Sequence, residues 1–324
     1  MPEKKNSPGK FRRSLREWRR RKRCQSAGSW PKDDRNAPEA HSTPRFQFIP
    51  EPLVSSGMFL LSTALRALSV SRYDKCIMKK RVLVIQSREN PAMVEIEQNG
   101  YRRVAGDGAD VHFLSALDPK LSWETPDAIL KGFDAVIFGG SGEFDLHGGR
   151  LGNDPARLMA TIILSRLRAL ITEVFASEMP ALGICFGHQL IAQMRGGCVM
   201  NDSGQKKAGS YEVNLTSEGK CDPLFESMPH SFVAQYGHRD SVTELPDGAV
   251  VLASGPSCRF SALRYGNSAY TFQFHPEVEP YEFAGRLKTA GYLPEGVAPE
   301  SVIRDSPEAS RLVRLFVEKI ASAN

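Results

Sequence analysis

From residue 78 onward, apolar and polar positions follow one another in the order expected for alternating strands and helices. The run Arg81–Ile85 is apolar after its first residue, which predicts a strand covered on both faces of a parallel sheet. Residues 91–104 have helical spacing, and Gly106 and Gly108 mark the end of that helix. Further strands are predicted at 110–116, at 134–138 and in the apolar run that ends at residue 185, with a short helix at 126–131. This alternation predicts an α/β fold with a doubly wound, mainly parallel sheet.

The longest predicted helix begins at Asp154, a residue type that caps helices, followed by Pro155, which suits the first helical position. Its apolar residues recur at helical spacing and are Leu158, Ile162, Leu167, Leu170, Ile171 and Val174. We interpret this stripe as a face that packs in the core and not as a partner surface.

Beyond residue 197 the pattern changes from alternating strands and helices to a series of strands, several of them separated by turn signals. Strands are predicted at 198–201, 210–216, 231–236, 249–253, 259–265 and 269–274. Helices at 280–290 and 307–320 end the chain, and Ser306 is the expected cap of the second. The α/β core therefore has an added β-rich region, and residues 78–324 are predicted to form one domain.

The segment Pro180–Gln189 has the pattern of a nucleophile elbow with cysteine at its centre. An apolar run ends at Cys185, Gly183 and Gly187 flank it, and the residues that follow predict a helix. A strand that turns abruptly into a helix leaves no room for side chains beside the central residue, so glycine is needed there. The sulfur then stands at a helix N-terminus, where backbone N–H groups favour a thiolate. The alternative is a buried structural cysteine between two turn glycines.

A histidine and a carboxylate follow another predicted strand. Residues 269–274 run into His275, and Glu277 comes two positions later. A cysteine nucleophile needs a nearby base, and that base needs an acid to orient it. Cys185, His275 and Glu277 supply these three residue types. Glu279 is a rival for the role of the acid.

The strand predicted at 134–138 runs into the loop Gly139-Gly140-Ser141-Gly142 at the carboxyl end of the sheet, where open α/β folds bind ligands. Glycines here let backbone N–H groups point into a site, which favours an oxyanion hole. The alternative is an ordinary glycine-rich turn. A phosphate-binding loop is excluded because the Gly-Lys-Ser/Thr ending is absent from this segment.

Together these motifs resemble the class I glutamine amidotransferases, over about residues 78–280. The resemblance implies a flavodoxin-like fold and a catalytic triad of Cys185, His275 and Glu277. It also implies an oxyanion hole made by the backbone N–H groups of Gly140 and Phe186. The substrate contacts that it implies come from Gln189, at the α-amino-acid end of glutamine, and from the backbone of Gly142 and of the loop Gly237, His238, Arg239 and Asp240.

The activity that the resemblance implies is hydrolysis of the glutamine side-chain amide through a γ-glutamyl thioester. Ammonia would pass to an acceptor or to a separate synthetase subunit, and neither a cofactor nor a metal is expected. Two other interpretations stay open: a γ-glutamyl peptidase that uses the same triad without a partner, and a non-catalytic binding or regulatory module on the same fold. The presence of Cys185, His275 and Glu277 argues against such a module.

Three positions depart from the family pattern. Relatives similar to the glutaminase of guanosine monophosphate synthetase usually carry Glu where this chain has Lys207, two residues before Gly209. Ser141 replaces the proline of the Gly-Gly-Pro-Gly loop, and Arg239 replaces the glycine of the His-Gly-Asp turn. The identity of the γ-glutamyl substrate therefore does not follow from the motifs.

Residues 1–77 differ from the rest of the chain in composition. The net charge is +5, yet residues 1–45 hold fourteen Lys and Arg against five Asp and Glu, so the remainder is mildly acidic. Few aromatic residues and no persistent element pattern predict a mostly disordered basic extension. We interpret its cluster Arg19–Arg23 as part of a solvated tail; the alternative is that it binds nucleic acid or anionic lipid, and no other nucleic-acid partner is expected.

Two other interpretations of this extension stay open. Arginine-rich leaders can be organelle transit peptides, although Asp33, Asp34 and Glu39 weaken that interpretation. Alternatively, the natural chain starts at Met78, directly before the first core strand.

The six cysteines show neither Cys-x-x-Cys nor Cys/His ligand spacing. We therefore expect free thiols in a reducing compartment, the cytoplasm, and neither a disulfide framework nor a zinc site. No apolar run approaches the roughly 20 residues that a membrane span needs, so no membrane partner is expected.

Overall fold

The computed structural model describes residues 79–322 apart from residues 290 and 294. The predicted basic extension, and with it the cluster Arg19–Arg23 and the start proposed at Met78, lies outside the described residues.

The first half of the described chain alternates strands with helices. Its elements are β1 (Lys80–Gln86), α2 (Pro91–Ala105), β2 (Ala109–Ser115), α3 (Pro126–Leu130), β3 (Ala135–Phe138), α4 (Pro155–Ala176), β4 (Ala181–Ile184) and α5 (Phe186–Met194). The second half is rich in strands: β5 (Cys198–Asn201), β6 (Lys207–Leu215), β7 (Ser231–His238), β8 (Asp240–Glu244), β9 (Ala249–Gly255), β10 (Cys258–Tyr265) and β11 (Ala269–Phe272). Helical segments in this half are α6 (Ser217–Lys220), α7 (Pro280–Thr289), η1 (Pro299–Val302), α8 (Pro307–Ser310), α9 (Leu312–Leu315) and η2 (Phe316–Ile320).

In the described part of the chain, one nine-stranded sheet has the order β2-β1-β3-β4-β11-β10-β9-β6-β7. Its first five strands are parallel to their neighbours, and the pairs from β11 through β10, β9 and β6 to β7 are antiparallel. β5 and β8 form a separate antiparallel pair. This arrangement confirms the predicted α/β fold with an added β-rich region.

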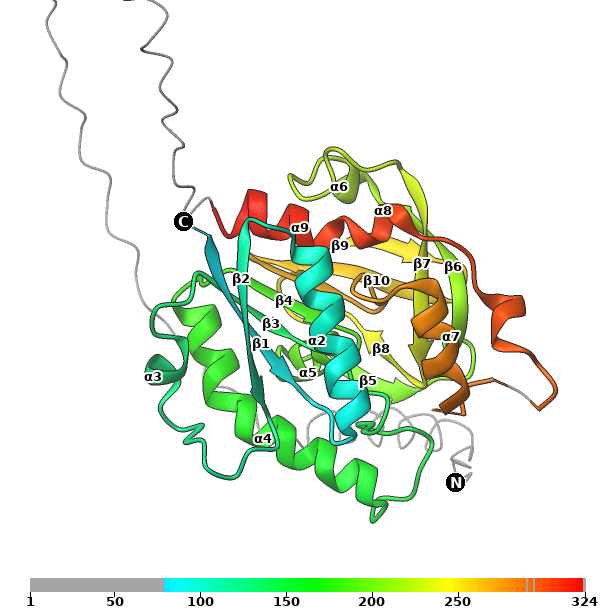
Figure 1. The fold of residues 1–324 in the computed structure, drawn as a ribbon, viewed down its shortest axis with the longest axis horizontal. Coiled ribbons are helices and arrows are strands. Elements are labelled where there is room, and N and C mark those ends of the chain that lie inside the picture. Colours follow the sequence, from blue (N-terminus) through cyan, green and yellow to red (C-terminus); the bar gives the residue numbers. More distant parts are fainter. Residues whose placement is uncertain (1–78, 290, 294, 323–324) are drawn as a thin grey trace, which may run out of the picture. The chain divides into compact units, whose positions relative to one another are not determined.

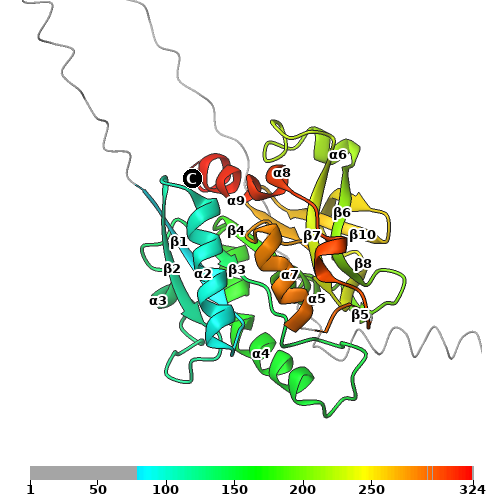
Figure 2. The ribbon, with the colours of Figure 1, turned by 45° about the vertical axis from the view of Figure 1, so that its right-hand side comes forward.

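Two apolar cores lie on opposite faces of the sheet because its central strands are buried on both faces. α2 and the C-terminal segments α8, α9 and η2 pack in one core, and α4 and α5 pack in the other. Figures 1 and 2 show α2 and the C-terminal helices in front of the sheet, with α4 and α5 on its other side.

The structure corrects two helix predictions. Leu158 and Ile162 are 51% and 44% exposed, so the predicted apolar stripe of α4 is wrong at these positions. In this first part of α4 the buried face runs through Ala160 and Ile163 instead. The remaining predicted positions are confirmed as buried, and they are Leu167, Leu170, Ile171 and Val174. The helix predicted at 307–320 is three segments, because α8 ends before Arg311 and η2 is a π-helix.

Two further predictions are incomplete. The strand β8 was not predicted, because its apolar alternation is short and directly follows the turn at Arg239. Cys185, Cys221 and Cys258 are free, but Cys198 is disulfide-bonded, so the prediction of free thiols throughout is wrong at that residue. Cysteine spacing alone does not reveal which residues meet in space.

Candidate active site

Cys185 lies between β4 and α5, in the strained turn that the sequence predicts. Its backbone has φ 50° and ψ −97°, a conformation that L-residues rarely adopt and that is typical of a nucleophile elbow. A Cβ on Gly187 would lie 2.1 Å from the Phe138 carbonyl oxygen, and one on Gly183 would lie 3.0 Å from the Gly187 backbone. Both flanking positions therefore require glycine because other backbone segments approach them.

Sheet register explains why Cys185 and His275 meet. β4 and β11 are parallel neighbours with Ile184 opposite Phe272, so both strands end at the same edge of the sheet. His275 follows β11 closely, and its N–H donates to the Gln235 carbonyl oxygen at 2.8 Å. A Cβ on Gly140 would lie 2.8 Å from His275 Cε1 and 3.5 Å from the Cys185 Cβ, so both side chains border the same loop. The two loops predicted to converge are therefore in contact.

Glu277 lies behind the imidazole of His275. The distance between His275 Nδ1 and Glu277 Oε1 is 2.8 Å, and Glu277 is completely buried. Nε2 is therefore the imidazole nitrogen that can exchange a proton with the sulfur of Cys185. The rival Glu279 is an ion-pair partner of Arg103 at 2.9 Å and is partly exposed, so it belongs to a different contact.

For His275 and Glu277, the effect of charge pairing on the pKa opposes the effect of burial. Burial alone would lower the pKa of His275, but the charges of Glu277 and Cys185, together with hydrogen bonds to both, raise it to about 9. Burial would raise the pKa of Glu277, but His275 and then Arg286 lower it to about 2. At neutral pH the imidazole therefore holds a proton and the carboxyl is ionised.

The glycine loop after β3 packs against this group. A Cβ on Gly140 would lie 2.8 Å from His275 Cε1 and 3.5 Å from the Cys185 Cβ, so the loop approaches both side chains. Within the described residues, no hydrogen bond uses the N–H of Gly140 or of Phe186. These N–H groups are the ones predicted for the oxyanion hole. Ser141, which stands where the family has proline, accepts through Oγ from the N–H groups of Glu143 and Phe144 and so closes the loop locally.

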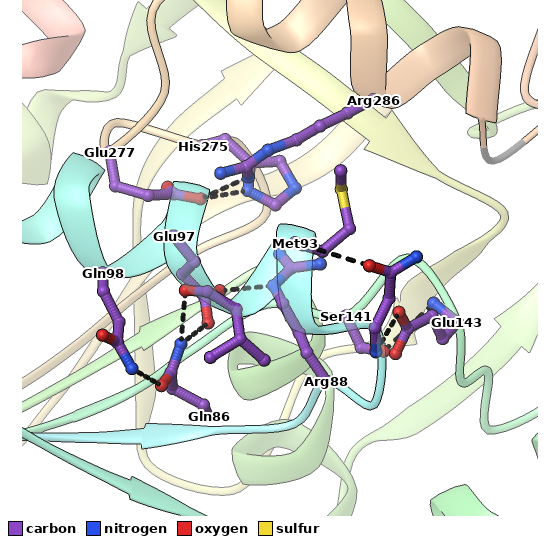
Figure 3. A network of polar contacts seen from close by, with 12 residues as sticks. Gln86, Arg88, Met93, Glu97, Gln98, Ser141, Glu143, His275, Glu277 and Arg286 are labelled. Atoms are coloured by element: carbon purple, nitrogen blue, oxygen red, sulfur yellow. Dashed lines mark hydrogen bonds and ion pairs between the residues drawn. The ribbon is translucent and has the colours of Figure 1, made fainter.

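Two buried ion pairs adjoin the site and were not predicted from the sequence. Arg286 of α7 donates through Nη1 to Glu277 Oε1 at 3.2 Å. Arg88, just after β1, pairs through Nε with Glu97 Oε1 at 2.9 Å, and Gln86 donates to the other oxygen of Glu97 at 2.9 Å (Figure 3). The sequence does contain a signal for such pairs: a charged residue on an otherwise apolar helix face would be buried, and a buried charge needs a partner.

That signal is clearest in α2 and α7. Glu97 lies on the buried face of α2 with Tyr101 and Val104, and Arg286 lies between the buried Phe283 and Leu287 on α7. Burial and the charges of Glu97 and Glu277 also act on Arg88, and the pKa of its guanidinium rises above the ordinary value because the acids outweigh burial.

The predicted substrate residues are distributed around the elbow. Gln189 is buried on α5 and donates through Nε2 to the Asp240 carbonyl oxygen at 2.8 Å. Arg239 Nη1 lies 3.5 Å from Asp145 Oδ2, and the Arg239 guanidinium lies 4.3 Å from the ring centroid of Tyr292. Gly142 lines the cavity described below.

His188 and His238 are buried, and among the described residues neither has an acidic side chain as hydrogen-bond partner. His188 Nδ1 bonds Thr271 Oγ1 at 2.8 Å, and His238 Nδ1 bonds the Asp240 carbonyl oxygen at 2.9 Å. Burial lowers the pKa of each to about 3, so both imidazoles are neutral at pH 7. Because Asp240 offers a carbonyl oxygen, Nδ1 of His238 carries the proton.

Lys207, where the related glutaminases have Glu, is buried on β6. Its Nζ lies 4.4 Å and 4.8 Å from the ring centroids of Tyr211 and Tyr236, a cation–π arrangement. Burial lowers the pKa of this ammonium group.

A cavity of about 150 Å³ opens beside His275. Its wall includes Arg88 and Met93 on one side, Ser141 and Gly142 from the glycine loop, and Phe283 and Tyr292 from the C-terminal part. Among residues 79–322, gaps excepted, no cluster of three or more His, Cys, Asp or Glu side chains could hold a metal ion. The described helices include none that is both long and apolar enough to cross a membrane.

Known proteins resemble this chain in sequence. The family model "Glutamine amidotransferase class-I" matches residues 125–290. A glutamine-hydrolysing GMP synthase subunit of Methanopyrus kandleri is 39% identical over 114 residues, which are 35% of this chain and 59% of the relative. The corresponding subunit of Methanocaldococcus jannaschii is 35% identical, over 36% of this chain and 63% of the relative. The chain thus matches less than two thirds of the length of these relatives.

Solved structures agree on the fold. A glutamine amidotransferase of Thermotoga maritima has a TM-score of 0.53 at 22% identity, and it covers 75% of this chain and 98% of its own. A GMP synthase subunit of Thermoplasma acidophilum has a TM-score of 0.52 at 19% identity, over 76% of this chain and 95% of its own. Since the family model matches half of the sequence, the chain belongs to the class-I glutamine amidotransferase family.

Proposed function

We propose that this protein hydrolyses the side-chain amide of glutamine through a γ-glutamyl thioester on Cys185. The observation that carries the proposal is the convergence of three groups. Cys185 stands in a strained turn at the start of α5, His275 and Cys185 both border the Gly140 loop, and Glu277 lies 2.8 Å behind the imidazole. The relatives named as glutamine-hydrolysing support the same reaction.

In the first step Cys185 Sγ attacks the amide carbon. The positive end of α5 and the protonated imidazole of His275 both adjoin the sulfur as it attacks. As the carbonyl oxygen becomes negative, the N–H groups of Gly140 and Phe186 donate to it. Each donor of this kind typically contributes about 3 to 4 kcal/mol to the stabilisation of the transition state.

Collapse of the tetrahedral intermediate breaks the C–N bond. His275 gives its proton to the departing nitrogen, which leaves as ammonia, and the γ-glutamyl group stays on sulfur as a thioester. His275 then takes a proton from water, which attacks the thioester and releases glutamate and the thiolate. Glu277 keeps the imidazole oriented and stabilises its charge in both steps.

Glutamine would bind with its amide at Cys185 and its α-amino-acid end toward Gln189, His238 and Arg239, with Gly142 contributing backbone contacts. Ammonia would pass to a separate synthetase subunit. The relatives that are named as one subunit of a synthase support this division of labour. Co-purification of such a subunit with the tagged full-length protein, and faster ammonia release in its presence, are the expected results.

Ammonia release from glutamine by the purified full-length protein tests the reaction. Cys185→Ala should abolish release, and Cys221→Ala should not change it, because Cys221 is a free, exposed cysteine outside the elbow. Release that survives Cys185→Ala would overturn the proposal. If the protein neither releases ammonia nor reacts at Cys185 with a diazoketone analogue of glutamine, it is a binding module and not an enzyme.

A further inference from the structure

The cavity beside His275 has a polar group that the hydrolysis of glutamine does not use. Arg88 is 5% exposed and lines this cavity together with His275. A Cβ on Gly140 would lie 3.4 Å from Arg88 Nη2, so the guanidinium adjoins the proposed oxyanion loop. Figure 3 shows the Arg88 side chain beside Glu97.

The guanidinium of Arg88 is held by one edge only. Its Nε pairs with Glu97 Oε1 at 2.9 Å, and Glu97 is fixed in turn by Gln86. In the described part of the chain, Nη1 and Nη2 of Arg88 donate no hydrogen bond, and neither nitrogen is fully buried. These two amino groups therefore reach the cavity with their protons available.

Several other polar groups of the cavity wall are engaged elsewhere. Glu143 accepts from the N–H groups of Glu89 and Asn90, and Ser141 Oγ accepts within its own loop. Arg286 also lines the cavity; its Nη1 donates to Glu277, and its Nε and Nη2 are fully buried without a hydrogen-bond partner among the described residues. Arg88 is thus a fixed, planar donor whose Nη groups are not fully buried, and such a fork matches the two oxygens of a carboxylate.

The position of the cavity indicates which part of a substrate would fill it. His275 lines the cavity and, in the proposed reaction, protonates the departing nitrogen. Gly142 and Gly237, from the two loops proposed to contact glutamine, also line it, whereas Gln189, His238 and Arg239 do not. Because His275 lines the cavity, the cavity adjoins the leaving group. Its volume of about 150 Å³ is several times larger than ammonia requires, since one water molecule needs about 10–15 Å³.

We propose that this site also hydrolyses γ-glutamyl amides whose leaving amine carries a carboxylate, such as γ-glutamyl amino acids, and that Arg88 binds that carboxylate. The inference rests on the proposed thioester chemistry. Sγ of Cys185 forms the thioester as the C–N bond breaks, and the amino acid leaves with the proton from His275. Water then releases glutamate. Arg88 acts as a specificity residue, and Met93 and Phe283 provide apolar walls for a small side chain.

The experiment compares γ-glutamylglycine with γ-glutamylglycinamide, in which a neutral carboxamide replaces the carboxylate of the leaving amine. With the wild-type protein, kcat/KM should be roughly 10- to 100-fold higher for γ-glutamylglycine, the range expected for hydrogen bonds to a charged group. In Arg88→Gln this ratio should fall to between about one and three. Free glycine should be detected as the product with the wild-type protein.

Removing Arg88 leaves Glu97 buried without its partner, so Arg88→Gln could fold poorly. The double variant Arg88→Met/Glu97→Gln removes both charges and should show the same loss of discrimination. Equal kcat/KM for the two γ-glutamyl amides in the wild-type protein, beside measurable glutamine hydrolysis, would overturn this inference and leave the proposed function intact. Absence of turnover of every substrate, with Cys185 unlabelled, would overturn the proposed function itself.

Discussion

In two buried regions of the molecule, the pKa of histidine shifts in opposite directions. Beside the elbow, the pKa of His275 is raised to about 9, because Glu277 and Cys185 outweigh burial. Between α5, β7 and β8, burial lowers the pKa of His188 and of His238 to about 3. All three side chains are buried. Burial alone makes an imidazole neutral, and an adjacent acid is what turns a buried histidine into a proton carrier.

The histidines of the two regions also make stability depend on pH in opposite directions. The folded protein binds the His275 proton more tightly than the unfolded chain, so this contribution is fully present below pH 6.5 and is lost as the pH rises through about 9. The unfolded chain protonates His188 and His238 below pH 6.5, whereas the folded protein resists until about pH 3. These residues therefore destabilise the fold progressively as the pH falls between those values.

Glu277→Gln should give the largest effect, because it makes the surroundings of His275 resemble those of His238. We expect kcat for glutamine to fall roughly 10³- to 10⁴-fold, as when a triad acid becomes an amide. The basic limb of the kcat/KM profile should move from near pH 9 toward pH 6.5, since the charge that holds the imidazolium is gone. Steady-state kinetics between pH 5 and 10 measure both; an unshifted basic limb would contradict the assigned role.

Arg286→Gln should mainly weaken the fold around Glu277. It removes one of the two cationic partners of a completely buried carboxylate, and breaking such a pair typically lowers the free energy of unfolding by about 3 kcal/mol or more. Urea unfolding at pH 7 is the measurement. The matched control is Arg311→Gln, an exposed arginine, which should change stability by less than about 0.5 kcal/mol. Equal stabilities of the two variants would contradict this role of Arg286.

His188→Gln tests the second region. Between pH 7 and pH 5, the wild-type protein should lose about 2 kcal/mol more stability than this variant, because glutamine cannot take up a proton in the unfolded chain. The comparison uses the pH-dependent difference in the free energy of unfolding, so the lost hydrogen bond to Thr271 cancels. Parallel stability curves for the two proteins would show that His188 titrates normally.

Glu279→Gln should have the smallest effect and serves as the control for Glu277→Gln. Glu279 pairs with Arg103 on a partly exposed surface, where such pairs contribute about 0 to 1 kcal/mol. We expect kcat/KM within about twofold of the wild-type value. A loss comparable to that of Glu277→Gln would mean that the acid role belongs to Glu279.

The sequence predicted the parallel half of the fold well because its strands are continuous apolar runs punctuated by glycine. It also indicated the meeting of Cys185 and His275, since both follow strands whose carboxyl ends share an edge. The short strand β8 was missed. The buried face of α4 was predicted correctly from Leu167 onward but not at its start, because Leu158 and Ile162 fit a helical period without lying on the buried face.

Arg88, Glu97 and Arg286 were missed for a different reason. Their partners are distant in sequence or on other elements, and a charged residue in a helix is most often exposed. Only the packed structure shows that Arg286 reaches Glu277 and that Arg88 borders the same cavity as His275. Long-range pairing of buried charges is therefore the part of this site that local patterns do not encode.

The central claim is that Cys185 carries the γ-glutamyl group. The most direct measurement is peptide mapping by mass spectrometry after the full-length protein has been mixed with a γ-glutamyl substrate and quenched in acid. We predict a γ-glutamyl adduct on the peptide that contains Cys185 and none on those with Cys221 or Cys258. Turnover without an adduct on Cys185, or an adduct on another cysteine, would contradict the claim.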